Sequence, residues 1–309
     1  MYGFFALQSA ISIPNVRESI VAYESNVAES SWRSKHQGLV CIPEFVAELI
    51  FLGTGNAFSP PGRMHSLALL DGEILIDAPP TVIPQLRRAG VNPSQLKHLL
   101  FTHWHADHTF GFPFLMLDRE KMGPLDGYDG VLEVHCRPGG RELLSGLCNT
   151  GFPGSLDGIL SEGIKWNKSE SGGLDGTDWS FERFPVIHSP ETDPHGYSLA
   201  HRSGIRILHC GDSGPCQEIE DRASESEIVI LEMGVPDFVE SPFHHNPSDV
   251  ISFSRRHPEI RTMVTHNYSK SPESKQGFDI PDLPDEIVQL NDGDSIIIEN
   301  DCSISVKKA

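Results

Sequence analysis

The sequence predicts an α/β protein in which two packed sheets are covered by helices, a four-layer αβ/βα sandwich. From about residue 46 onward, short apolar segments of strand length alternate with helical segments. Both halves of this region contain two strand pairs followed by β–α units. Histidines and aspartates stand where several of the strands end. Because helices pack on the outer faces of sheets that face each other, this order of elements favours four layers.

Composition and charge restrict the partners and the compartment. The 309 residues include 28 glycines and are 38% apolar, which is typical of a soluble globular protein. The net charge of −19 disfavours a long polyanionic partner, although a local basic patch would still allow nucleic acid to bind. The six cysteines contain no CxxC pair, which favours reduced thiols and a cytoplasmic location. No membrane association is expected, since no apolar stretch approaches the ~18–20 residues of a bilayer span.

The main domain is expected over residues 46–309, after an N-terminal extension, residues 1–45, that packs on the core or on a partner subunit. In its first half, Asp71-Gly72 is a strong signal for a two-residue hairpin, and Gly90 is placed to end a helix. Apolar patterning predicts the other elements there. Strands are expected at 48–52, 66–70, 73–77, 98–101 and 131–136, and helices at 81–89, 112–122 and 141–147.

In the second half, residues 150–178 are rich in Gly, Ser and Asp and indicate a loop region, interpreted as a flap near the functional site. Asn246 followed by Pro247 indicates the start of a helix that runs to about His257. A short helix is also expected within 280–290, and an apolar run ending at Glu232 resembles a buried strand. Further strands are expected at 181–188, 197–201, 205–210, 262–265, 296–298 and 303–306.

The run Thr102–His108 contains four metal-capable side chains directly after an apolar strand. His103 and His105 lie two residues apart, so an extended backbone directs both to the same side. Asp107 and His108 follow where the chain must turn, and they can face a second point nearby. Imidazole with one or two carboxylates suits Zn²⁺, and also Mn²⁺ or Fe²⁺. A His-rich surface loop is the alternative, but low-complexity His tracts lack the apolar lead-in.

Three further candidate ligands lie at other strand ends. His188 ends the segment 185–188, Asp212 lies in a turn after an apolar strand, and His266 follows the strand 262–265. Loops at strand ends are where α/β sheets build their sites. The residues therefore predict a metal centre assembled from distant parts of the chain.

With these candidate ligands, the chain resembles the metallo-β-lactamase superfamily, and within it the ribonuclease Z-like branch. The resemblance covers about residues 46–270 and implies a metallo-β-lactamase-like hydrolase domain over 46–309. The combination of the histidine signature with three outlying ligands in this order is very specific. The matching positions are Phe51–Gly55, Arg63, Ser66, Asp77, His103, His105, Asp107, His108, Gly111, His188, Gly196, Tyr197, Asp212, Thr265 and His266.

The resemblance implies two Zn²⁺ ions, with Mn²⁺ or Fe²⁺ as alternatives, and a hydroxide that bridges them as the nucleophile. The ligands of the first ion would be His103, His105 and His188, and those of the second Asp107, His108 and His266. Asp212 would bridge the two ions. Asp107 would also orient the hydroxide or take its proton, and Asp77 would accept the second N–H of a ligand imidazole.

The residues that contact the substrate are less clearly indicated. The family places a histidine near the substrate, and His245 aligns best with it, so His245 is the candidate leaving-group acid, with neighbouring His244 as a substrate residue. A plain surface pair is the alternative for both. Arg63 is assigned either to a substrate phosphate or to stabilising its turn, and His195 is a weaker rival of His188 as a ligand. No role follows from the sequence for Glu232.

Several departures from the branch bear on the substrate. The turn after Asp77 reads Ala-Pro-Pro-Thr instead of an acidic, Gly-rich sequence, and Leu231 stands where a proton-donating histidine is expected. Residues 138–180 do not resemble a tRNA-binding arm. With the net charge, these points favour a phosphodiesterase acting on a small or nucleotide-like substrate. The alternatives are a ribonuclease Z-type tRNA 3′-processing nuclease, a lactonase, β-lactamase-like or thioester hydrolase, and a non-catalytic metal-binding scaffold. A homodimer is expected by analogy with the branch.

Overall fold

A computed structural model describes residues 45–128, 130–299 and 301–309. The predicted extension over residues 1–45 lies outside the described residues, apart from its last position. In the described part of the chain, no helix is long and apolar enough to cross a bilayer. The description below concerns the unit that contains the main domain.

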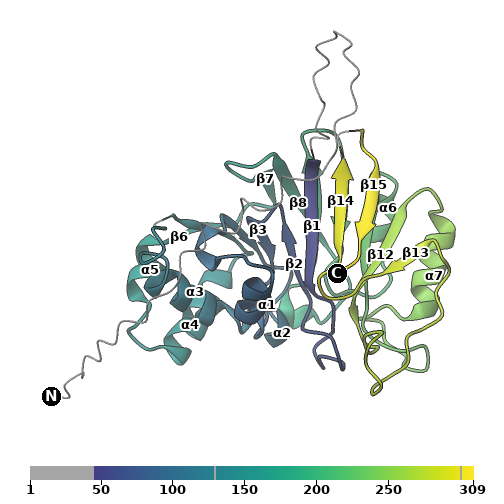
Figure 1. Ribbon diagram of the computed structural model, residues 1–309, viewed down its shortest axis with the longest axis horizontal. Helices are drawn as coiled ribbons and strands as arrows, with labels where there is room; N and C mark the ends of the chain where they lie inside the picture. The colour runs from purple at the N-terminus through teal and green to yellow at the C-terminus, as the bar shows by residue number, and fades with distance from the viewer. Residues whose placement is uncertain (1–44, 129, 300) are drawn as a thin grey trace, which may run out of the picture. The chain divides into compact units, whose positions relative to one another are not determined.

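Two sheets form the centre of this domain (Figure 1). The first has eight strands in the order β15-β14-β1-β2-β3-β4-β5-β6, and the second has seven in the order β13-β12-β11-β10-β9-β8-β7. The strands of the first sheet are β1 Phe45–Gly53, β2 Leu67–Leu70, β3 Ile74–Ile76, β4 His98–Leu100, β5 Leu132–His135, β6 Ile164–Asn167, β14 Ser295–Glu299 and β15 Ile304–Lys307. Those of the second sheet are β7 Ser171–Gly173, β8 Trp179–Pro185, β9 His195–His201, β10 Arg206–His209, β11 Ile228–Met233, β12 Arg261–Asn267 and β13 Ile287–Gln289.

The helices lie on the outer faces of the two sheets (Figure 1). On the first sheet they are α1 Val82–Arg88, α3 Phe112–Lys121, α4 Gly140–Gly151 and α5 Asp157–Glu162, and on the second α6 Gln217–Ala223 and α7 Pro247–Arg256. A short helix α2, Ala106–Thr109, and two 3₁₀ turns, Pro93–Gln95 and Pro190–Thr192, lie in loops. Three buried apolar clusters hold the layers together, one between the sheets and one under each helical layer. The predicted four-layer sandwich is confirmed.

The alternation of side chains along each strand explains the layers. In β4, Leu100 packs between the sheets while its neighbour Leu99 packs against the helices. Such a strand is buried on both faces and therefore has no polar alternation. The predicted turn at Asp71-Gly72 joins β2 to β3 with positive φ at both residues, but Leu70 pairs with Ile74, so the loop also includes Glu73 and is not the two-residue hairpin expected. Asn246 caps α7 in a capping box with Asp249, which explains why the sequence marks this helix start so clearly.

Two expectations are wrong. Residues 150–178 are not a flap, because they contain α5, β6 and β7, and the two strands form one edge of each sheet. β7 is Ser-Gly-Gly and exposed, so it has no apolar pattern that could identify it. Residues 280–290, all of which the structure describes, contain β13 and no helix. This short edge strand pairs in parallel with β12, a partner distant in sequence.

Candidate metal centre

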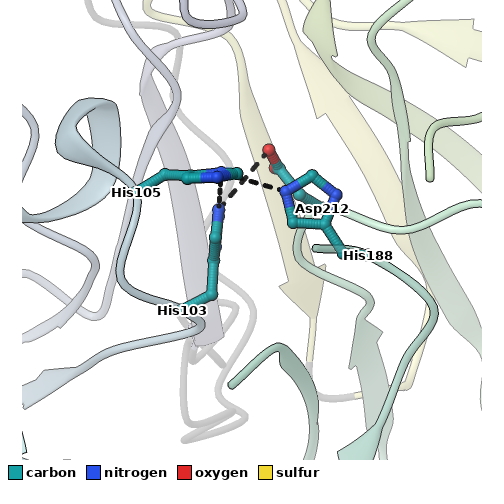
Figure 2. A group of neighbouring side chains, drawn as sticks. All are labelled: His103, His105, His188 and Asp212. Atoms are coloured by element: carbon teal, nitrogen blue, oxygen red, sulfur yellow. Dashed lines mark hydrogen bonds and ion pairs between the residues drawn. The ribbon is translucent and has the colours of Figure 1, made fainter. Parts of the chain in front are cut away.

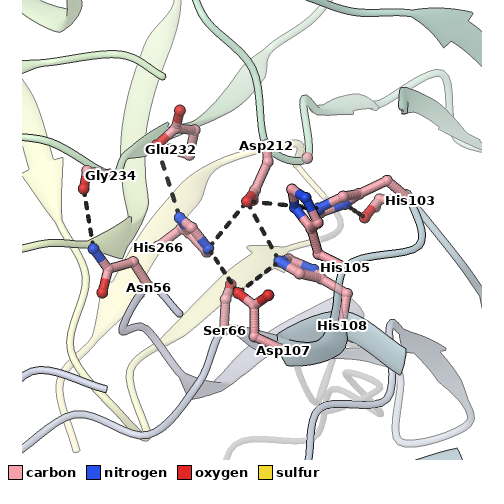
Figure 3. A network of polar contacts seen from close by, with 12 residues as sticks. Asn56, Ser66, His103, His105, Asp107, His108, Asp212, Glu232, Gly234 and His266 are labelled. Carbon is pink, nitrogen blue, oxygen red and sulfur yellow. Dashed lines mark hydrogen bonds and ion pairs between the residues drawn. The ribbon is translucent and has the colours of Figure 1, made fainter. Parts of the chain in front are cut away.

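All seven predicted ligands converge at loops that follow strands (Figures 2 and 3). One strand of the first sheet, β4, and three strands of the second, β8, β10 and β12, lead to them. His103 and His105 lie in the loop after β4, and Asp107 and His108 lie in α2, the next element. In the second sheet, His188 follows β8, Asp212 follows β10, and His266 lies near the end of β12.

The first group consists of His103, His105, His188 and Asp212, whose donor atoms all lie within 4.8 Å of one another (Figure 2). His105 Nδ1 is 3.0 Å from His103 Nε2 and 3.0 Å from His188 Nε2. The Asp212 carboxylate lies 3.8 Å from His103 Nε2. His188 Nδ1 donates to the Phe243 carbonyl, 3.0 Å away, so its Nε2 presents a lone pair to the group.

The second group consists of Asp107, His108, Asp212 and His266 (Figure 3). Asp212 Oδ2 is 3.1 Å from His266 Nε2 and 3.4 Å from His108 Nε2. Asp107 Oδ2 is 3.2 Å from the same atom of His108 and 3.4 Å from that of His266. Asp212 therefore belongs to both groups, as a bridging carboxylate would.

The electrostatics of the two groups differ. Burial lowers the pKa of His103, His105 and His188, which keeps these imidazoles neutral and able to bind a cation. Burial also acts to lower the pKa of His266, but Asp212 and other acids raise it overall to about 10. The pKa of His108 is likewise raised, because Asp212 and Asp107 outweigh its burial. The second group thus carries an excess of negative charge that needs a positive partner.

The donor set fits a pair of divalent cations. Nitrogen donors from imidazole and oxygen donors from carboxylate are the usual ligands of zinc and of similar metals. His108 Nε2 is buried and has no hydrogen-bond partner, although it faces two carboxylates. A cation between these groups would satisfy that nitrogen and neutralise the acids. The shared Asp212 allows one cation in each group.

Asp77 holds His108 in place. It follows β3 with a left-handed backbone, φ 69°, and its carboxylate accepts the backbone N–H and the hydroxyl of Thr102, each at 2.8 Å. His108 Nδ1 donates to the same carboxylate at 2.8 Å, so Nε2 faces the second group. Gly111 lets this segment approach, because a Cβ there would collide with the Pro79 carbonyl. The expected role of Asp77 agrees with this geometry.

Asp77→Asn is expected to weaken metal binding in the second group about 10- to 100-fold. An amide that donates to His108 Nδ1 would force the imidazole proton onto Nε2, the atom that faces the group. Competition with a chelator at constant pH measures the affinity. Asp118→Asn, which removes the charge of a surface ion pair with Arg87, is the control and should leave affinity unchanged. Equal affinity in Asp77→Asn and wild type would contradict this role.

The structure places the two adjacent histidines in different surroundings. His244 stacks on His266 with ring centroids 6.2 Å apart, lies 4.9 Å from the ring of His188, and has a side chain that is 26% exposed. His245 is buried, and its Nδ1 donates to the Ser213 carbonyl at 2.6 Å. Of the two residues, His244 is therefore the one whose ring lies beside His188 and His266, whereas the sequence favoured His245 for that position.

Glu232, to which the sequence assigned no role, is the residue that orients His244. It is buried at the end of β11, and its Oε1 accepts His244 Nδ1 at 3.0 Å and the backbone N–H of His245 at 2.9 Å. Its second oxygen is 3.8 Å from His266 Nδ1 (Figure 3). Although burial lowers the pKa of His244, the bond to Glu232 raises it overall. A buried acid at a strand end was the only signal available.

Arg63 is a structural residue. Its Nε donates to the Ser269 carbonyl at 2.9 Å, and its Nη1 donates to the Leu290 carbonyl at 2.8 Å and to Thr54 Oγ1 at 2.6 Å. The guanidinium is buried among these loops and does not belong to either metal group. The contacts therefore support a structural role, in which Arg63 joins separate loops that contain Thr54, Ser269 and Leu290.

Arg63→Met is expected to destabilise the fold by about 3 kcal/mol, because two buried carbonyls and a hydroxyl lose a charged donor. For a domain of this size the loss corresponds to a Tm lower by roughly 6–12 °C. Thermal unfolding of the purified variant measures it. Arg88→Met, at an exposed neighbour on α1, is the control and should leave the Tm within a degree or two, as is usual for surface changes. Lost activity at an unchanged Tm would instead favour a substrate role.

His195, the rival of His188, lies outside both groups. It is buried in β9, where its Nδ1 donates to the Asp193 carbonyl at 3.1 Å and its Nε2 is 3.4 Å from the Tyr197 hydroxyl. Burial lowers its pKa to about 3. His188 is thus the histidine that this part of the chain brings to the centre.

Comparison with known proteins gives a consistent result. A family model described as the beta-lactamase superfamily domain matches residues 73–267. The ribonuclease Z of Pyrobaculum calidifontis is 26% identical over 263 residues, which cover 74% of this chain and 89% of that protein. The crystal structure of the short form of human tRNase Z has a TM-score of 0.58 at 19% identity, covering 81% of this chain and 98% of the other. A diphosphatase of the PhnP family has the same TM-score and identity, covering 81% and 96%.

The family match spans more than half of the chain and contains every residue of the two metal groups. The structural similarities independently support the fold. The chain belongs to the beta-lactamase superfamily and is a hydrolase with the metallo-β-lactamase fold.

Proposed function

We propose that this hydrolase is a dinuclear metal-dependent phosphodiesterase. The observation that carries the proposal is the shared position of Asp212 between two four-residue donor groups, beside a histidine that Glu232 orients. His103, His105 and His188 would hold one cation, and Asp107, His108 and His266 would hold the other. Two divalent cations there supply Lewis acidity, which activates water and polarises a phosphoryl oxygen.

Asp107 and His244 are the residues that we expect to accept and donate protons. Asp107 has a side chain that is 11% exposed, so one of its oxygens can accept a hydrogen bond from an attacking water and orient it. His244 lies at the partly exposed side of the centre and carries a proton favoured by Glu232. We assign to His244 the donation of that proton to the oxygen of the leaving group. Phosphodiester cleavage needs such a donor when the leaving group is an alkoxide.

The relatives alter the order of the candidate substrates. The sequence alone ranked a small phosphodiester first, but relatives named ribonuclease Z favour an RNA phosphodiester. We therefore propose ribonuclease Z-type cleavage at an RNA 3′ end as the first candidate. Hydrolysis of a small nucleotide-like phosphodiester is the second, because the net charge of −19 disfavours a long polyanion.

A substrate panel tests the proposal. A precursor tRNA with a 3′ trailer, bis-p-nitrophenyl phosphate, an acyl-homoserine lactone and a cephalosporin are each assayed with Zn²⁺ and with Mn²⁺. We expect turnover of the first two and not of the carbonyl substrates. Cleavage of bis-p-nitrophenyl phosphate without the tRNA would favour the second candidate. Turnover of the lactone or cephalosporin alone would contradict a phosphodiesterase, and two bound metals without any turnover would favour a scaffold.

A further inference from the structure

A third cluster of metal-capable side chains lies between the sheets, at the start of β4. It consists of His98, Glu133 and His135, and it shares no residue with the two groups described above. In the parallel pairing of β4 with β5, His98 is opposite Glu133, and His135 is two residues further along the same face. All three residues are buried, with exposed fractions of 1%, 6% and 0%.

The donor atoms of this cluster face one another. His98 Nδ1 and His135 Nε2 are 3.0 Å apart, the same separation as between His103 and His105 in the first metal group. The two Glu133 oxygens each lie 4.0 Å from one of these nitrogens. One atom from each residue can therefore reach a single ion at the ~2.0–2.2 Å that Zn²⁺ requires with small side-chain adjustments.

Both imidazoles are held in a form that can bind a metal. His98 Nε2 is 3.0 Å from the Asp175 carbonyl, which can only accept, so the proton of His98 is on Nε2 and its Nδ1 offers a lone pair. Burial lowers the pKa of His135 to about 3, so this ring is neutral. Without a cation, His135 Nε2 must donate to His98, and the other ring nitrogen of His135 is buried without a partner.

The carboxylate is oriented by a residue outside the cluster and is at present paired with a lysine. Glu133 accepts Asn167 Nδ2 at 2.8 Å and Lys165 Nζ at 3.0 Å. Lys165 Nζ also lies 3.0 Å from the carboxylate of Asp175, and its side chain is 56% exposed. The Lys165 ammonium is exposed and can move into solvent, while a bound cation would replace it as the partner of the buried Glu133 carboxylate. The exposed Asp175 carboxylate would then be available as a fourth ligand.

We propose that His98, Glu133 and His135 form a third divalent-cation site, with a donor set that suits Zn²⁺, in which the Lys165 ammonium and the metal compete for Glu133. The site is structural, because its ligands are buried between the sheets and leave no open position for a substrate. A bound ion would tie β4 to β5 and, through Asp175, to the loop between β7 and β8. Its ligands are independent of those in the proposed catalytic centre.

The number of zinc ions per chain tests this site. Equilibrium dialysis of the full chain against Zn²⁺, followed by elemental analysis, should give three ions for wild type and two for His98→Gln. His201→Gln, a substitution of another buried strand histidine, is the matched control and should retain three. An unchanged count in a folded His98→Gln would overturn the site.

Lys165→Gln is a second test for the case in which His98→Gln does not fold. Because Lys165 is exposed, we expect its substitution to leave the fold intact. Removal of the competing cation should tighten the third site at least about tenfold, and an affinity no tighter than wild type would contradict the proposal. Two ions in both wild type and Lys165→Gln, both of them retained in His98→Gln, would overturn it without affecting the dinuclear centre. Conversely, one ion that is lost in His98→Gln and retained in Asp212→Ala would support this site and contradict the catalytic pair.

Discussion

Asp212→Ala is expected to lower the metal content by two ions per chain and to reduce phosphodiester hydrolysis by at least about 10³-fold. Asp212 is the one side chain that belongs to both donor groups, and its carboxylate lies 3.1–3.8 Å from His103, His108 and His266. Without it, each group loses a ligand and most of the negative charge that attracts a cation. Loss of several kcal/mol of Lewis-acid stabilisation corresponds to a rate loss of this size. Elemental analysis and steady-state kinetics on the same sample measure both effects.

The control separates loss of metal from loss of stability. Asp249→Ala removes the capping box of α7 and should cost about 1 kcal/mol of stability, while metal content and activity stay at the wild-type level. Circular dichroism and thermal unfolding show whether each variant is folded. A folded Asp212→Ala that keeps both ions and full activity would rule out the bridging assignment.

The metal groups could be predicted from the sequence because their signals are local. His103, His105, Asp107 and His108 lie within six residues after a recognisable strand, and this spacing indicates that their side chains lie close together. The other ligands, His188, Asp212 and His266, lie at or after the ends of β8, β10 and β12. These strands run in the same direction, so their ends lie along one edge of the second sheet. The four-layer fold was predictable for a similar reason, since hairpin signals such as Asp71-Gly72 and helix caps such as Asn246 are short-range.

The features that the sequence did not reveal depend on contacts between distant segments. The pair formed by Glu232 and His244 joins the end of β11 to a separate loop, so neither residue identifies the other. Arg63 contacts carbonyls of residues more than two hundred positions away. The edge strand β7 is exposed Ser-Gly-Gly and is a strand only because β8 pairs with it.

The cluster of His98, Glu133 and His135 illustrates the same limit. Its residues come from two strands separated in sequence by α2 and α3, and only the register of β4 with β5 brings them together. A one-residue change of register would direct Glu133 and His135 toward the helices instead. Alternation within each strand can be read from the sequence, but the register between parallel strands cannot.

His244→Ala is expected to slow the cleavage of an RNA phosphodiester about 10²- to 10⁴-fold, which is the usual contribution of a positioned general acid. The same variant should hydrolyse bis-p-nitrophenyl phosphate nearly as fast as wild type. An alkoxide is a poor leaving group and needs the proton that His244 supplies, whereas p-nitrophenolate leaves without one. The ratio of the two rates therefore isolates proton donation from metal binding, which would slow both substrates alike.

His245→Ala is the matched control, because it removes the adjacent imidazole and leaves the backbone N–H that donates to Glu232. It should lower the Tm, since His245 is buried and bonded to Ser213, but it should keep the wild-type ratio of the two rates. Glu232→Gln should change the ratio in the same direction as His244→Ala, because a neutral partner favours the imidazolium less. Equal slowing of both substrates in His244→Ala would rule out His244 as the acid. A changed ratio in His245→Ala alone would assign the acid to His245, the residue that the sequence favoured.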